Sequence, residues 1–193
     1  MQGDIKWVDS MLVNMTVEEK VGQLVFLNTK IDSSAQEDSL FKWVNQKQIG
    51  GLMMKGMEVD NFVRLVDTVQ QISKRPLFIA ADQESVLQNF FSDAYQFPNK
   101  SSFASIRSDS LQKALQHYLI KQYGAMGINF TFSPTVNEFC YKKDEKMKGP
   151  IFDDKVRLLQ NAVEYMNAFQ KEKIFCAANT FDQFIYIDND TTG

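Results

Sequence analysis

The sequence predicts an α/β fold built from about five parallel β/α units, and three observations support this. The chain has 193 residues, which is enough for one sizeable domain. Apolar residues make up 44% and charged residues 23%, as in folded proteins with a substantial core. Short runs that are apolar throughout alternate with stretches whose apolar residues repeat at helical spacing. Such alternation is typical of parallel strands covered by helices.

The first β/α unit begins with two helical signals. Apolar residues from Trp7 to Leu12 repeat at helical spacing and predict an N-terminal amphipathic helix. Thr16 and Glu19 have the spacing of a capping box, in which a hydroxyl and a carboxylate satisfy backbone amides at a helix start. The apolar run at residues 24–27 then predicts a first buried strand.

The next two β/α units repeat this order. A helical face around Leu40 precedes residues 49–54, which predict a helix stop followed directly by a second strand. Glycine is available there for a left-handed helix C-cap. A further helix begins at Val59 and ends before Pro76, which cannot continue it. Residues 77–81 predict the third strand.

Two further β/α units complete the pattern. A helix over residues 111–124 precedes a fourth strand at 128–132, and a long helix over 156–169 precedes a fifth strand at 173–178. Five such units fit either an open doubly wound sheet or most of a (β/α)8 barrel. A closed barrel takes about 250 residues, so a barrel here is partial.

Composition excludes several classes of function. The formal charge of −3 argues against a nucleic-acid binder, which needs a basic excess. No segment approaches the ~20 apolar residues of a membrane span. The only histidine, His117, is expected to be partly exposed on a helix, and Cys176 lies in an apolar run as an inert, buried thiol. Without clustered ligands, a dinucleotide fingerprint or a phosphate loop, we expect no metal and no cofactor.

The N-terminus lacks the basic and apolar regions of a signal peptide. The compartment therefore stays open: the protein is cytoplasmic, or periplasmic or secreted if a leader was removed.

Ligands of parallel β/α folds bind at the carboxyl ends of the strands, which directs attention to the polar residues there. Asp82 and Glu84 stand out, because two carboxylates two residues apart follow the third strand. The alternative is that one carboxylate caps a turn or helix while the other is solvated. The further polar residues at predicted strand ends are Asn28, Lys55, Ser133, Asn137, Asn179 and Thr180.

Five sequence blocks follow one another along the chain, at residues 15–24, 49–52, 81–84, 97–99 and 127–134. In this order they resemble the N-terminal domain of glycoside hydrolase family 3, and most closely its β-N-acetylhexosaminidase-like branch. The resemblance covers nearly all of the chain and implies one TIM-barrel-like domain over residues 1–193, with an incomplete (β/α)8 barrel. It also implies the family's activity, retaining hydrolysis of β-linked sugars, which needs a nucleophilic carboxylate and a general acid.

The resemblance assigns roles to single residues, and the sequence departs from it at several of them. Asp82 matches the carboxylate that holds sugar hydroxyls, and Glu84 also matches, but the two glycines that follow in the family are replaced. Asn137 stands where the family has an aspartate. Asn179 lies where a Lys-His-Phe-Pro-Gly-His-Gly block is expected, and residues 188–192 hold no Asp-x-His pair. We therefore expect Asp82, Glu84, Asn137 and Asn179 to bind substrate and no residue of this chain to be catalytic.

Three hypotheses for the function follow. The chain is a non-catalytic relative that binds sugar or a partner, or the N-terminal part of an active glycosidase whose nucleophile lies beyond residue 193 or on another chain. The third is a protein-interaction scaffold. An open sheet edge and exposed apolar helix faces would favour a homo-oligomer or a missing C-terminal partner segment that completes the barrel.

Overall fold

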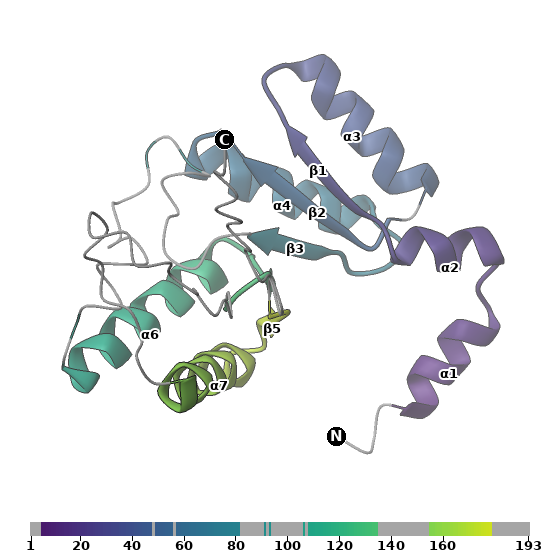
Figure 1. Ribbon diagram of the computed structural model, residues 1–193. Helices are drawn as coiled ribbons and strands as arrows, with labels where there is room; N and C mark the ends of the chain where they lie inside the picture. Colours follow the sequence, from purple (N-terminus) through teal and green to yellow (C-terminus); the bar gives the residue numbers. More distant parts are fainter. Residues whose placement is uncertain are drawn as a thin grey trace, which may run out of the picture. The chain divides into compact units, whose positions relative to one another are not determined.

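A computed structural model describes residues 5–47, 49–55, 57–81, 108–134 and 155–178, with Phe91, Asp93 and Ile106 (Figure 1). The helices are α1 (Ile5–Val13), α2 (Val17–Gln23), α3 (Ser34–Lys47), α4 (Val59–Ile72), α6 (Asp109–Ala125) and α7 (Lys155–Lys171). The strands are β1 (Phe26–Lys30), β2 (Gly51–Lys55), β3 (Phe78–Ala81), β4 (Phe130–Thr131) and β5 (Phe175–Cys176).

The chain forms two compact units. The first comprises Met1–Ala81, Gln88–Tyr95 and Met126–Ile128. The second comprises Asp82–Leu87, Gln96–Ala125 and Asn129–Gly193.

The first unit contains three parallel strands in the order β1-β2-β3. Each connection between them is a helix, α3 after β1 and α4 after β2, because parallel neighbours need a crossover. The register places Gly51 between Phe26 and Phe78, whose rings stack with centroids 6.0 Å apart. A Cβ at Gly51 would lie 2.4 Å from the Phe26 ring, so glycine makes room for this stack.

The core of the first unit lies between its helices and its sheet. Residues at i, i+3, i+4 and i+7 of α4 are buried, namely Phe62, Leu65, Val66 and Val69. Leu52 of β2 and Ile79 of β3 are register partners and have no exposed surface. The apolar residues that repeat at helical spacing in α4 therefore form its buried face, as predicted, and their burial stabilises the unit.

The second unit pairs β4 with β5 in parallel and packs α6 against α7. Tyr123 of α6 meets Phe169 of α7 edge to face, with ring centroids 5.7 Å apart, and both rings are buried. The predicted helices over residues 111–124 and 156–169 are confirmed. Over the described residues the five strands pair in parallel, which confirms the predicted α/β class.

The prediction of the first strand was wrong in position and in burial. Residues 24–27 were expected to form it, but α2 runs to Gln23, Leu24 is its C-cap, and β1 begins at Phe26. The capping box at Thr16 is confirmed by both of its hydrogen bonds. The capping box sets the start of α2, which runs to Gln23. The apolar run at residues 24–27 therefore spans the end of α2 and the start of β1. Among the described residues of the first unit, β1 pairs only with β2, and its residues are half-buried or exposed.

The prediction of a left-handed glycine C-cap before β2 was also wrong. The Gly50 amide donates to the carbonyl oxygens of Gly22 and Val25, at 3.0 and 3.1 Å. A Cβ on Gly50 would lie 1.9 Å from the carbonyl oxygen of Gln23. Glycine is therefore required by the close approach of two backbone segments, and not by a left-handed conformation.

The fourth and fifth strands are shorter than predicted, with two residues each. Lys173 was placed in the fifth strand, but its φ of 62° puts it in the turn that follows α7. The strand can begin only after this turn.

The N-terminal helix is confirmed as α1, but most of its apolar side chains are exposed. We use the name N-terminal apolar face for the set of exposed apolar residues on α1, on α2 and at the C-cap of α2, which are Trp7, Val8, Leu12, Val13, Val17, Val21 and Leu24. Their exposed fractions run from 42% for Val8 to 83% for Val13 and Leu24. Within the described ranges, no helix combines the length and the apolar composition required to cross a bilayer.

Candidate functional site

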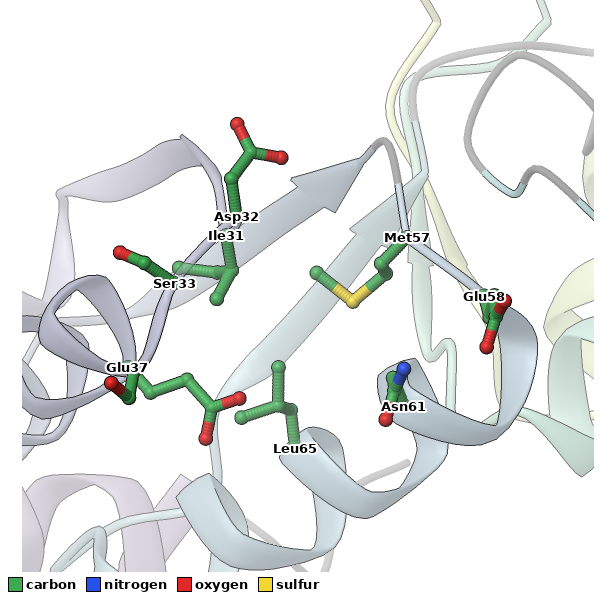
Figure 2. Close-up of a pocket in the computed structure, with 9 residues that line it drawn as sticks. Ile31, Asp32, Ser33, Glu37, Met57, Glu58, Asn61 and Leu65 are labelled. Atoms are coloured by element: carbon green, nitrogen blue, oxygen red, sulfur yellow. The ribbon is translucent and has the colours of Figure 1, made fainter.

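A pocket of about 430 Å³ lies in the first unit, where the chain leaves β1 and β2 (Figure 2). Its walls come from the loop after β1, the first turn of α3, and the start of α4. It is thus built at the carboxyl edge of the sheet, where parallel β/α folds bind their ligands.

The floor of the pocket is apolar. Ile31 directly follows β1, Met57 follows β2 by two residues, and Leu65 belongs to the buried face of α4. All three are buried, with exposed fractions of 9%, 7% and 1%. Figure 2 shows Met57 and Leu65 directed into the space beside Ile31. This floor could pack against an apolar surface of a ligand.

The rim is polar and carries more acidic than basic groups. Glu37 accepts two hydrogen bonds from Arg64, at 2.7 and 3.3 Å, and Asp32 lies 3.2 Å from Lys30. These ion pairs are largely exposed, so they contribute little to stability. Glu58 and Asn61 complete the rim. Glu58 is the N-cap residue of α4, yet its side chain makes no capping hydrogen bond. Its carboxylate is therefore available to a ligand.

The start of α4 is held by a distant part of the chain. The backbone amide of Val59 donates to Oδ1 of Asp93 at 2.9 Å. Met57 forms a parallel bridge with Phe91, whose ring meets Phe62 edge to face at 4.8 Å. The chain that leaves β3 therefore returns to the carboxyl end of β2 at Phe91.

The four predicted substrate-binding residues, Asp82, Glu84, Asn137 and Asn179, lie outside the described residues, as does Thr180. Asn28 and Lys55 are exposed on β1 and β2, but neither lines the pocket. Ser133 belongs to the second unit and is fully buried. The structure thus does not place these candidates in one described site.

The rim residues Glu37, Glu58 and Asn61 were not among the site residues predicted from the sequence. A signal was available, because Glu58 lies three residues after β2 and Asn61 lies one helical turn further on. Polar residues in the first turn after a strand belong to the carboxyl edge as much as those that end the strand.

Other reactive groups of the described residues do not form a site. Burial raises the pKa of the Cys176 thiol to about 11, so the thiol stays protonated and weakly nucleophilic at neutral pH. His117 is exposed on α6. In the part of the chain that the structure describes, no group of three His, Cys, Asp or Glu side chains is arranged to hold a metal ion.

Comparison with known proteins identifies the family. Residues 16–184 match the glycosyl hydrolase family 3 N-terminal domain. A curated relative, a β-N-acetylglucosaminidase/β-glucosidase from Cellulomonas fimi, is 25% identical over 183 residues, which are 92% of this chain and 31% of the relative.

Solved structures show the same fold. The β-glucoside phosphorylase BglX bound to 2FGlc has a TM-score of 0.75 and 20% identity, over 91% of this chain and 32% of that one. A family 3 glycosyl hydrolase from Mycobacterium smegmatis has a TM-score of 0.67 and 13% identity, over 86% of this chain and 50% of that one. The chain spans about a third of the length of the curated relative and of the phosphorylase. With most of its residues matched by the family's N-terminal domain, the chain belongs to glycosyl hydrolase family 3.

Proposed function

We propose that this chain is a single, incomplete family 3 N-terminal domain that binds a carbohydrate and does not by itself hydrolyse it. The observation that carries the proposal is the polar-rimmed pocket at the carboxyl edge of the first unit, in a chain of this family. A sugar ring has apolar C–H faces and carries hydroxyl groups around its edge. The apolar floor of the pocket could pack against the C–H faces, and the carboxylates and amide of the rim could form hydrogen bonds with the hydroxyls.

The sugar-binding role extends to four residues outside the described ranges. Asp82 and Glu84 follow β3, and Asn137 and Asn179 follow the strands of the second unit in the sequence. Carboxylates accept hydrogen bonds from hydroxyls, while amides both donate and accept. We take the ligand to be an N-acetylated β-linked sugar, on the sequence resemblance to the hexosaminidase-like branch.

The sequence supports the proposed lack of catalysis. Retaining hydrolysis needs one carboxylate as nucleophile and another group as acid/base. Residues 176–184 lack the Lys, His and Gly of the family block, and residues 188–192 lack the Asp-x-His pair. This chain alone thus retains groups that bind hydroxyls and lacks groups that break the glycosidic bond.

Thermal unfolding tests the binding. At a sugar concentration of ten times Kd, linkage predicts a stabilisation of about 1.4 kcal/mol, or about 3–6 °C in Tm for a chain of this size. We expect this shift with N-acetylglucosaminides and its loss in Asp82→Ala. Asp38→Ala, which removes an exposed carboxylate of α3, is the matched control and should keep the shift. No shift with any N-acetylated sugar would favour the interaction scaffold instead.

Hydrolysis of a chromogenic N-acetylglucosaminide tests the absence of catalysis. We expect this chain to release no chromophore above the buffer rate. Release by the purified chain, lost in Asp82→Ala, would refute the non-catalytic proposal while leaving sugar binding intact.

A second candidate is the N-terminal part of an active glycosidase, completed by further polypeptide or by a second copy. It is favoured by the N-terminal apolar face and by the side of β1 that pairs with no described strand. Sedimentation over a range of concentrations tests a second copy: a dimer favours it, and a monomer throughout excludes it. Chromophore release that appears only when the remaining barrel units are added would establish completion by further polypeptide.

A further inference from the structure

Arg64 of α4 holds the carboxylate of Glu37, a residue of the pocket rim, by two hydrogen bonds. Its two terminal nitrogens donate to different oxygens of Glu37, at 2.7 and 3.3 Å. Such a two-pronged contact fixes the plane of a carboxylate, which a single point charge does not do. Glu37 lines the pocket, whereas Arg64 does not. Any effect of the guanidinium on the pocket therefore passes through Glu37.

The backbone and the side chain of Glu37 are both directed by the fold. Glu37 lies in the first turn of α3, where its amide donates to the carbonyl oxygen of Ser33 at 3.2 Å. Figure 2 shows its side chain extended from α3 towards Leu65, which belongs to the apolar floor. Because α3 packs against α4, the two helices present a carboxylate and an apolar side chain to the same space.

Stability alone does not account for the contact between Arg64 and Glu37. The side chain of Arg64 is 51% exposed and that of Glu37 is 26% exposed, and ion pairs with this exposure contribute little to folding. A long side chain that is already held in one conformation, however, loses less entropy when a ligand binds to it. The contact is therefore better suited to prepare Glu37 for a ligand than to hold α3 and α4 together.

The Glu37 carboxylate keeps acceptor capacity on both of its oxygens. An ionised carboxylate has about four lone-pair positions, and the donors from Arg64 occupy one on each oxygen. The position left on each oxygen can only accept a hydrogen bond. A ligand must therefore meet Glu37 with a donor, which in an N-acetylated sugar is a hydroxyl or the amide N–H.

We propose that Arg64 is a positioning residue of the pocket, which orients the Glu37 carboxylate to accept a hydrogen bond from a hydroxyl or amide N–H group of the sugar. This inference rests on the proposed function, because Glu37 meets a sugar only if the pocket binds one. Arg64 makes no contact with the ligand, so its effect on binding depends entirely on Glu37.

A double-mutant cycle tests this dependence, with the Kd for methyl N-acetyl-β-glucosaminide measured by calorimetry. Glu37→Ala removes the acceptor and should weaken binding at least about tenfold, as for a lost hydrogen bond to a charged group. Arg64→Ala leaves the carboxylate free to rotate and should weaken binding about fivefold, as for the ordering of one long side chain. In the Glu37→Ala background, Arg64→Ala should change Kd by less than about 1.5-fold.

Arg64→Lys separates orientation from charge. Lysine keeps the positive charge but lacks the planar fork, so binding should stay at least about threefold weaker than in the wild type. Lys42→Ala and Asp38→Ala remove an exposed cation and an exposed carboxylate of α3 as matched controls, and each should stay within about twofold of the wild type. The Tm of Arg64→Ala should stay within about 4 °C of the wild type, because the ion pair is exposed.

The other outcomes overturn separate parts. Equal losses on Arg64→Ala with and without Glu37 overturn the positioning role, because Arg64 would then act on the fold or on the ligand directly. A wild-type Kd in Arg64→Lys overturns the need for the fork. An unchanged Kd in Glu37→Ala overturns this inference while sugar binding stands. A wild-type chain that binds no N-acetylated sugar overturns the proposed function and this inference with it.

Discussion

Replacement of Gly50 by alanine is expected to destabilise the first unit strongly, because the backbone there has no room for a side chain. The added Cβ would lie 1.9 Å from the carbonyl oxygen of Gln23 and 2.6 Å from its carbonyl carbon. Both neighbours are backbone atoms, so no side-chain rotation can relieve the overlap. The C-terminal end of α2 and the residue before β2 must move apart.

The size of the effect follows from what this movement breaks. Overpacking of a buried site costs about 1–3 kcal/mol. The Gly50 amide also donates to the carbonyls of Gly22 and Val25, and losing one such bond costs about 1 kcal/mol. We therefore expect Gly50→Ala to lower the free energy of unfolding by about 3 kcal/mol, and Tm by about 6–12 °C.

Gly124→Ala is the matched control for this prediction. Gly124 lies in α6, and a Cβ there would meet nothing within 4 Å. Alanine is the better helix former, so this variant should gain about 0.5–1 kcal/mol. Urea unfolding and thermal unfolding of the two variants should shift in opposite directions. If Gly50→Ala unfolds within about 2 °C of the wild type, the close approach to Gln23 is not a feature of the folded protein.

Three further predictions concern the capping box, a buried hydroxyl and the described cysteine. Thr16→Ala should cost about 1 kcal/mol in thermal unfolding, because it removes the acceptor for the Glu19 amide; an unchanged Tm would contradict the capping role. Thr131→Val should leave urea stability unchanged or raise it by about 1 kcal/mol, because the fully buried hydroxyl has no partner among the described residues; a clear loss would mean that it has one. Cys176 should react with iodoacetamide near pH 8 about 100-fold more slowly than in urea, by mass spectrometry of its peptide, since burial raises its pKa from 9.0 to about 11. The thiol ionises at a lower pH in the unfolded chain than in the folded one. The stability that the neutral thiol gives to the folded state is therefore complete below pH 9.0 and is lost as pH rises through about 11. Equal rates in buffer and urea would contradict the burial.

Sequence patterns predicted the helices well because helical spacing reports directly on burial. The residues of α4 that repeat at this spacing are the ones that the folded chain buries. The first strand was misplaced for a related reason. Residues 24–27 span the C-cap of α2 and the start of β1, which is only partly buried. Their apolar character therefore does not mark one buried strand.

Contacts between distant backbone segments had no signal in the sequence. The need for glycine at position 50 arises from Gln23, and the cap of α4 comes from Asp93. Both depend on how the chain returns in space, which no local pattern encodes.

The candidate site was predictable in location but not in composition. Parallel strands place ligands at their carboxyl ends, and the pocket lies there. Its apolar floor depends on Met57 and Leu65 meeting beside Ile31, which requires knowledge of the packing of α4. The assignment of Asp82, Glu84, Asn137 and Asn179 to sugar binding stays a prediction.

The N-terminal apolar face also affects how the protein behaves on handling. Attraction between exposed apolar surfaces near room temperature is mainly entropic, so it weakens on cooling and strengthens on warming. A preparation that scatters light at ambient temperature should therefore clear when chilled, and more readily in mild urea than in sulfate, which promotes apolar contact. Purification in the cold at low sulfate would suit a protein with this flank uncovered.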